Sequence, residues 1–330
     1  MKRMYGLIAI LVLFLTVAFF KEDQNKTKQT QIPEVGVLTL MHHPSLDEIY
    51  QGFLDGLKQK GYRDGKNIKI DYQNANNDQS NLQTMSTRLV DQRPNVLVGI
   101  TTPAAQALAN ATTNIPIVLG AVTNPQTSGL VKNMAHPEAN ITGVSDAAPI
   151  KQQLQLIKEF MPNLQTLGVI YTSSDASAVS GFHEIEAECR KMHIKLKAFS
   201  IANSNDLNQV SEQMFRQIDA VIVPTDNTIA GAMQTLVKNG NAAGKPIFPA
   251  AANMVKQGGL ATYSVNQYEL GKLTADMTVD ILHGKKVSSL PIKRIQKGQP
   301  VINLKQAKRL KIKVPESFLK QCEKQGVVYR

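Results

Sequence analysis

Residues 34–61, EVGVLTLMHHPSLDEIYQGFLDGLKQKG, contain an apolar run, a short polar loop and an amphipathic segment. The apolar run at 34–40 suits a buried strand of a parallel sheet. In the amphipathic segment, Leu46, Ile49 and Phe53 keep helical spacing. The stretch therefore predicts a strand, a loop and a helix, which is the first unit of an alternating β/α pattern.

The same order of elements occurs a second time along the chain. The second series starts with the apolar run TLGVIYT at 166–172, and IPIV at 115–118 corresponds to PIFP at 246–249. Strands and helices that alternate at these lengths are typical of parallel sheets with helices on both faces. We predict an α/β fold with two doubly wound parallel-sheet lobes.

A further strand and helix follow the second series, at 259–265 and 268–284. We expect this helix to return to the first lobe and the chain end to return to the second, so that the chain crosses between the lobes several times. The predicted division is lobe 1 from 35–146 plus 266–288, and lobe 2 from 147–265 plus 289–330.

The N-terminal residues 1–20 have the pattern of a signal sequence. Lys2 and Arg3 precede an uncharged run from Tyr5 to Phe20, which as a helix would span roughly 24 Å. No small-residue cleavage site and no cysteine for lipid attachment follow. We predict an uncleaved signal anchor, with cleavage and secretion as the alternative, and a polar linker at 21–34. Either way, the rest of the chain would lie outside the cytoplasmic membrane.

The composition argues against a nucleic-acid-binding protein. The formal net charge is +11, but aromatic residues make up 5% of the chain, tryptophan is absent and the basic residues are scattered. Nucleic-acid recognition favours clustered Lys and Arg with interleaved aromatic residues. Attraction to an anionic membrane or cell-wall surface is a simpler explanation of the charge.

The sequence shows no positive sign of catalysis or of a cofactor. No GxSxG, Walker A loop or HExxH motif is present. His42 and His43 are adjacent but have no second pair of metal ligands at a suitable spacing. We therefore predict a protein that is not an enzyme and that has neither a cofactor nor a metal site.

Six predicted loops at the carboxyl ends of the strands are rich in Ser, Thr, Asn and small residues. Ligands of open parallel sheets bind at this edge. Several of the loops begin a helix, and helix N-termini favour an anionic group such as a carboxylate. For any single residue, simple N-capping is the alternative explanation. The loops are 41–45, 101–104, 122–125, 171–177, 224–228 and 250–254.

Several of these motifs, in order and spacing, resemble those of ABC transporter substrate-binding proteins. The motifs are VGVLTLMHHPSLDEIYQGFLDGLKQKGY, VGITTPAAQALA, AVTNPQTSGLV, NITGVSD, VPTDNTIAGA and GGLATYSVNQYELG, and the resemblance covers about residues 35–320. It is closest to the subfamily that includes tryptophan- and other aromatic-amino-acid-binding proteins. It implies a type I periplasmic-binding-protein-like fold, in which a hinge joins the two lobes and the ligand cleft between them closes on an amino acid. Tryptophan or phenylalanine is favoured.

The resemblance also implies partners. A monomeric protein of this kind delivers its ligand to an ABC permease and the associated ATPase. A ligand sensor of the same fold, which signals to a membrane partner, is the alternative. Asn124 stands where relatives tend to carry Asp, and the lipid-attachment cysteine common in Gram-positive members is missing.

The implied ligand-binding residues lie on both lobes. Hydroxyl and backbone N–H groups would hold an α-carboxylate, and Asp226 or Asp146 would accept from an α-ammonium. Tyr171 and Met254, with Met41 and nearby alanines, would form an apolar pocket. The full predicted set is Ser45, Thr102, Ala104, Thr123, Asn124, Ser145, Asp146, Tyr171, Ser173, Ser174, Asp226, Asn227, Thr228 and Met254.

Overall fold

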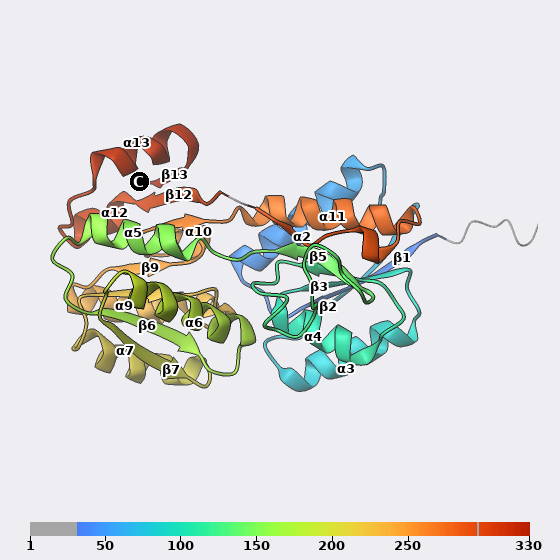
Figure 1. The fold of residues 1–330 in the computed structure, drawn as a ribbon, viewed down its shortest axis with the longest axis horizontal. Coiled ribbons are helices and arrows are strands. Elements are labelled where there is room, and N and C mark those ends of the chain that lie inside the picture. Colours follow the sequence, from blue (N-terminus) through green and yellow to red (C-terminus); the bar gives the residue numbers. More distant parts are fainter. Residues whose placement is uncertain (1–31, 296) are drawn as a thin grey trace, which may run out of the picture.

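The computed structural model describes residues 32–295 and 297–330, which form two α/β lobes connected by crossing segments (Figure 1). The predicted signal anchor at 1–20 lies outside the described residues, as does most of the predicted linker. Glu34, at which the predicted linker and the predicted strand at 34–40 overlap, begins the first strand. In the described part of the chain, no helix is both long and apolar enough to cross a membrane.

The first lobe contains a six-stranded sheet in the order β11-β5-β4-β3-β1-β2, and every neighbouring pair is parallel. Strands β3, β4 and β5 are buried along their whole length, as expected for parallel strands covered on both faces. The strands are β1 (Glu34–Thr39), β2 (Lys69–Asn74), β3 (Val96–Ile100), β4 (Ile117–Gly120), β5 (Ile141–Ser145) and β11 (Lys293–Arg294).

Two pairs of helices cover the two faces of this sheet (Figure 1). On one face, α2 and α11 pack against each other and against the sheet, with Phe53 and Met277 in the shared core. On the other face lie α3 and α4, with Leu89 and Leu108 in the core. The helices are α2 (Pro44–Gln59), α3 (Gln79–Asp91), α4 (Thr102–Ala111) and α11 (Gln267–Leu282).

The second lobe contains a four-stranded parallel sheet in the order β7-β6-β8-β9. This order repeats the order β2-β1-β3-β4 of the first lobe, so the predicted duplication and the α/β class with two parallel-sheet lobes are confirmed. The strands are β6 (Leu167–Thr172), β7 (Leu196–Ile201), β8 (Ala220–Val223) and β9 (Ile247–Pro249).

Helices and a small mixed sheet complete this lobe. β10 (Ala261–Ser264) pairs antiparallel with β12 (Gln299–Asn303), and β12 pairs parallel with β13 (Val327–Tyr329). The α-helices are α5 (Ile150–Phe160), α6 (Ala176–Lys191), α7 (Leu207–Phe215), α8 (Asn227–Gly231), α9 (Met233–Ala243), α10 (Ala252–Lys256), α12 (Leu304–Arg309) and α13 (Glu316–Gln325). A short 3-10 helix, Ser204–Asp206, also belongs to this lobe, whereas a second one, Val287–Ser289, lies against β5 of the first lobe.

The chain passes between the lobes after β5, after β10 and after β11. One segment departs from the predicted division into lobes. Lys293 and Arg294, predicted in lobe 2, pair with Val144 and Ser145 at the edge of the first sheet. A two-residue edge strand is too short to show the period-two alternation by which a strand is recognised in sequence.

Candidate functional site

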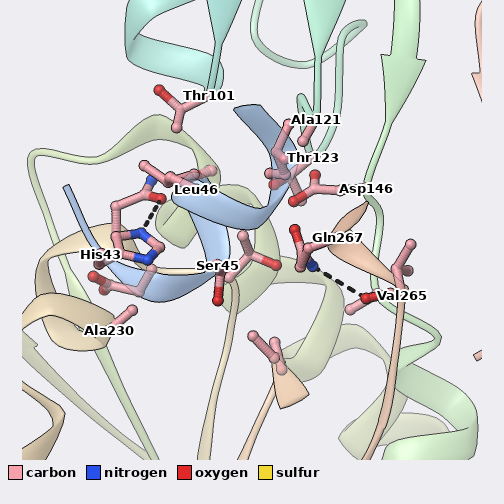
Figure 2. A pocket seen from close by; sticks show the side chains of 18 of the residues that line it. His43, Ser45, Leu46, Thr101, Ala121, Thr123, Asp146, Ala230, Val265 and Gln267 are labelled. Carbon is pink, nitrogen blue, oxygen red and sulfur yellow. Dashed lines mark hydrogen bonds between the residues drawn. The ribbon is translucent and has the colours of Figure 1, made fainter. Parts of the chain in front are cut away.

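The carboxyl ends of the parallel strands in both lobes meet at one cavity, with about 580 Å³ of free space (Figure 2). This volume includes space that is open to solvent. The lining residues are His43, Ser45, Leu46, Ile49, Thr101, Thr102, Ala121, Thr123 and Asp146 from lobe 1, Ala148, Ser177, Thr225, Asp226, Asn227, Ala230, Ala250, Ala251 and Met254 from lobe 2, and Val265 and Gln267 from a crossing segment.

The structure brings seven of the predicted site residues together around this cavity. They come from the β1–α2, β3–α4, β4–β5 and β8–α8 loops, the end of β5, and α10. They are Ser45, Thr102, Thr123, Asp146, Asp226, Asn227 and Met254. Residues far apart in the sequence, such as Ser45 and Asp226, which are 181 positions apart, therefore line one space because equivalent strand ends of the two lobes face each other.

Three predicted residues of lobe 1 do not line the cavity. Ala104 is buried in the core on the side of α3 and α4. Ser145 donates its hydroxyl hydrogen bond to the carbonyl oxygen of Thr123, at 3.0 Å, and so holds a lining loop in place. The amide of Asn124 donates to Oε1 of Glu184 on the opposite lobe, at 3.3 Å.

Four predicted residues of lobe 2 also lie outside the cavity lining. The ring of Tyr171 stacks on Phe182, with a centroid distance of 4.5 Å, and does not form an apolar wall of the cavity. The hydroxyls of Ser173 and Ser174 donate to backbone carbonyls at the end of β7, at 3.2 and 3.1 Å. Thr228 is buried within α8. Sequence alone placed these residues at the correct strand ends but did not reveal where their side chains point.

Asp226 uses both carboxylate oxygens within its own lobe. Oδ1 accepts from the backbone N–H of Ile229, at 2.9 Å, and thereby caps α8. It also accepts from the hydroxyl of Thr172, and Oδ2 accepts from the Thr172 backbone N–H at 2.6 Å. Burial, followed by the nearby charge of Asp175, raises the pKa of Asp226 to about 7. Asp226 thus ties the end of β6 to α8.

Asp146 has different surroundings. It is buried at the end of β5, and its Oδ1 has no hydrogen-bond partner among the residues that the structure describes. Burial is the main cause that raises the pKa of Asp146 to about 6. In Figure 2 the side chain of Gln267 points toward Asp146 and Thr123, while its amide donates to the carbonyl of Val265 at 3.1 Å. Asp146 therefore offers a free acceptor to whatever enters the cavity.

Hydroxyl groups and two helix N-termini supply the donors of the site. Thr102 begins α4 and Ser45 lies in the first turn of α2, and both are buried. The hydroxyl of Thr102 has no partner within the described part of the chain. Among the residues that line the cavity in the described structure there is no Lys or Arg. An anionic group bound here would be held by hydroxyls, backbone N–H groups and helix dipoles.

Two residues at the strand ends have strained backbones. Thr101, directly after β3, has φ 94°, and Ala121, directly after β4, has φ 66°. Such conformations cost non-glycine residues of order 1–3 kcal/mol and concentrate at functional sites. Both residues line the cavity.

The rest of the lining is apolar. Leu46 and Ile49 of α2, Ala230 of α8, Met254 of α10 and Val265 are all buried or nearly so. No Phe, Tyr or Trp ring lines the cavity in residues 32–295 and 297–330. Across the same ranges, no group of three or more His, Cys, Asp and Glu side chains could hold a metal ion. The arrangement suits a small molecule with charged and apolar parts.

Several lining residues were not predicted individually. His43 and Thr101 lie inside predicted loops, but their residue types gave no reason to select them over their neighbours. Gln267 was missed because it lies on the crossing helix α11, outside the duplicated pattern. Only the return of α11 to lobe 1 places it beside Asp146.

Comparisons with known proteins agree with this architecture. The family model described as ABC transporter substrate binding protein matches residues 34–325. A tyrosine-binding protein from Clostridioides difficile (strain R20291) is 34% identical over 281 residues, which are 85% of this chain and 81% of the relative.

Two solved structures extend the comparison. The structure of an ABC domain in complex with L-Trp from Streptococcus pneumoniae is 40% identical with a TM-score of 0.86, over 90% of this chain and 99% of that chain. A ligand-free, open substrate-binding protein with adhesive properties from Clostridium difficile is 32% identical with a TM-score of 0.70, over 91% of this chain and 99% of that chain.

Proposed function

The chain belongs to the family of ABC transporter substrate-binding proteins, which are not enzymes, and we propose that it binds an aromatic amino acid between its lobes. It would then deliver this ligand to an ABC permease. The free Oδ1 of buried Asp146 carries the proposal. A buried, unpaired carboxylate oxygen is costly unless a ligand supplies a donor, and an α-ammonium is such a donor.

The groups around Asp146 suit the rest of an amino acid head. The unpaired hydroxyl of Thr102, the hydroxyl of Ser45 and the N-terminus of α4 would hold the α-carboxylate without a cationic side chain. Gln267, beside Asp146, would accept a second hydrogen bond from the ammonium. Of the residues predicted for these roles, Asp146 rather than Asp226 is assigned to the ammonium, because the oxygens of Asp226 are already engaged.

The apolar lining supports an aromatic side chain. Leu46, Ile49, Met254 and Val265 offer aliphatic and thioether contacts, which suit the flat, apolar faces of an aromatic ring. The relatives point to the same ligand class, since one is a tyrosine-binding protein and another is in complex with L-Trp.

The arrangement of the lobes fits a closed state. Coverage of this chain is nearly equal in the two structural comparisons, yet the TM-score is 0.86 with the L-Trp complex and 0.70 with the ligand-free, open structure. A different angle between two otherwise similar lobes would produce this difference. Hydrogen bonds across the cleft, such as Asn124 to Glu184 and Thr127 to Ser180, support a closed arrangement.

The cellular setting follows from the family. Its members typically lie outside the cytoplasmic membrane. We place this protein there as a monomer, held by residues 1–20 as a signal anchor, and serving a permease with its ATPase. The basic net charge of +11 would favour contact with an anionic membrane or cell-wall surface.

A thermal-shift screen of the protein against the twenty amino acids, followed by calorimetry, tests the ligand class. A ligand at 100 times its Kd stabilises a protein by roughly 2.7 kcal/mol. We expect such a shift with tyrosine, tryptophan or both. Thr102→Val should weaken binding by about tenfold or more because a hydroxyl partner is lost, whereas Ser174→Ala, outside the cavity, should not. If no amino acid shifts the transition, the proposed function is wrong.

A further inference from the structure

His43 lies between the lobes with one ring nitrogen paired and the other unpaired. Its Nε2 is 3.3 Å from Oδ1 of Asn227, which belongs to the other lobe. The side chain is buried, with 7% of its surface exposed. Its Nδ1 has no hydrogen-bond partner among the residues that the structure describes, and the residue lines the cavity.

The neighbours of Asn227 determine which nitrogen of His43 carries the proton. The Asn227 amide nitrogen donates to Oδ2 of Asp175, at 3.1 Å. The other oxygen of Asp175 accepts from the backbone N–H of Ser177, at 2.8 Å, and from its hydroxyl. Because a carboxylate only accepts hydrogen bonds, the NH₂ group of Asn227 faces Asp175 and its oxygen faces His43. Nε2 of His43 must therefore donate.

The remaining nitrogen, Nδ1, is then an acceptor. Burial lowers the pKa of His43 below its usual value, which keeps the ring neutral near pH 7. A neutral imidazole with its proton on Nε2 has a lone pair on Nδ1. A buried acceptor without a partner is costly, so the site is complete only when a ligand brings a donor to this position.

The position of His43 indicates which part of the ligand supplies this donor. In Figure 2, His43 and Asp146 lie on opposite sides of the cavity. The α-ammonium is assigned to Asp146 and the α-carboxylate to Thr102 and Ser45, which leaves the His43 side of the cavity for the side chain of the ligand. Ala230 and Leu46 beside His43 are apolar and provide no competing donor.

We propose that Nδ1 of His43 accepts a hydrogen bond from the ligand's side chain, and that the site thereby selects aromatic amino acids that carry a side-chain donor. The tyrosine hydroxyl and the tryptophan indole N–H meet this requirement, and phenylalanine does not. This inference rests on the proposed function. It narrows the ligand class expected from sequence, which included phenylalanine.

Calorimetry with L-tyrosine, L-tryptophan and L-phenylalanine tests the proposal on the unaltered protein. A site built around a hydrogen bond rejects the analogue that lacks the partner, because the buried group is left unpaired. We expect tyrosine or tryptophan to bind at least about tenfold more tightly than phenylalanine. Equal affinities for all three would overturn the role of His43 and leave the proposed function intact. Binding of none of them would overturn the proposed function itself.

A His43→Gln variant distinguishes a role of His43 in ligand selection from a role in lobe closure. The glutamine amide nitrogen can replace Nε2 as the donor to Asn227, whereas the ring acceptor Nδ1 is removed. We expect the preference over phenylalanine to shrink to within a few-fold, because tyrosine or tryptophan loses its partner and phenylalanine no longer leaves the ring Nδ1 unpaired. If the substitution lowered the affinity for all three ligands by one common factor, His43 would act in lobe closure alone, and the proposal would be wrong. Should the variant not fold, the ligand series with the unaltered protein still decides the question.

Discussion

At the scale of single residues, two buried aspartates of one cavity differ in what their oxygens contact. Asp226 accepts three hydrogen bonds from its own lobe, whereas Oδ1 of Asp146 has no partner in the described structure. Sequence left the two as equal candidates for the ammonium, because both follow a strand and precede a helix. Their different hydrogen bonds separate a structural carboxylate from one that is free for a ligand.

Replacing Asp146 with Asn should weaken amino-acid binding by about tenfold to a hundredfold. The variant loses a charge-assisted hydrogen bond, which is worth roughly 1.5–3 kcal/mol. Calorimetry gives the two Kd values. Asp276→Asn, on the partly exposed surface of α11, serves as the matched control and should bind like the unaltered protein. A Kd unchanged by Asp146→Asn would remove this residue from the site.

Binding should also weaken as the pH falls below about 6. Burial raises the pKa of Asp146 to about 6, against smaller lowering effects of hydrogen bonding from the Thr123 side chain and from the backbone N–H of Asp146 itself. The ligand's ammonium would favour the ionised carboxylate. Below the pKa of Asp146, binding must therefore release a proton from its carboxyl group, so the affinity decreases as the pH decreases. The pKa of His43 is lowered, so its ring becomes protonated only at a lower pH than an ordinary histidine. Calorimetry between pH 5 and 8 should show this slope, and Asp146→Asn should flatten it.

Asp226→Ala should affect stability more than binding. The variant loses the cap of α8 and leaves the buried N–H of Thr172 unpaired, which together cost about 2 kcal/mol or more. Urea denaturation measures this loss. Asp78→Ala, which removes only the exposed cap of α3, should cost about 1 kcal/mol. Loss of binding by Asp226→Ala at unchanged stability would show that Asp226 contacts the ligand.

At the scale of elements, α2 and α11 approach each other closely through glycines. A Cβ atom added at Gly52 would lie 2.1 Å from the carbonyl oxygen of Tyr268, and one added at Gly271 would lie 2.0 Å from that of Ile49. This close packing of α2 and α11 holds α11 against lobe 1 and places Gln267 at the cavity. Sequence predicted both helices, but their contact depends on residues more than 200 positions apart.

Gly52→Ala should destabilise the protein by about 2 kcal/mol or more, because backbone rather than a flexible side chain blocks the new methyl group. Thermal or urea unfolding measures the effect. Gln59→Ala, at an exposed position of the same helix, is the control and should stay within about 0.5 kcal/mol of the unaltered protein. Equal stability of the two variants would show that α2 and α11 can move apart without cost.

At the scale of the whole molecule, hydrogen bonds across the cleft hold the lobes together. Asn124 donates to Glu184, and the hydroxyls of Thr127 and Ser180 lie 3.2 Å apart. Asn124 was predicted to touch the ligand and lies at the cleft rim instead. If the lobes close on a ligand as proposed, this contact with α6 would stabilise the closed arrangement.

Glu184→Ala should speed ligand release and weaken binding by about two- to tenfold, because a partly exposed hydrogen bond contributes roughly 0.5–1.5 kcal/mol. Stopped-flow dissociation measures the rate. Glu184→Gln keeps an acceptor oxygen for Asn124 and should release the ligand at nearly the original rate. An unchanged rate in Glu184→Ala would exclude this contact from closure.

The sequence by itself determined the α/β class, the two-fold repetition and the strand ends that meet at the cavity. These follow from local periodicity, because a buried strand, a loop and an amphipathic helix each show their pattern within a few residues. Only the tertiary structure decided which side chains of those loops enter the cavity. Tyr171 and Ser174 turn away from it, whereas His43 pairs with Asn227, 184 residues further along the chain, and Gln267 returns on α11. Such contacts depend on how the two lobes face each other, and short-range sequence periodicity does not encode that arrangement.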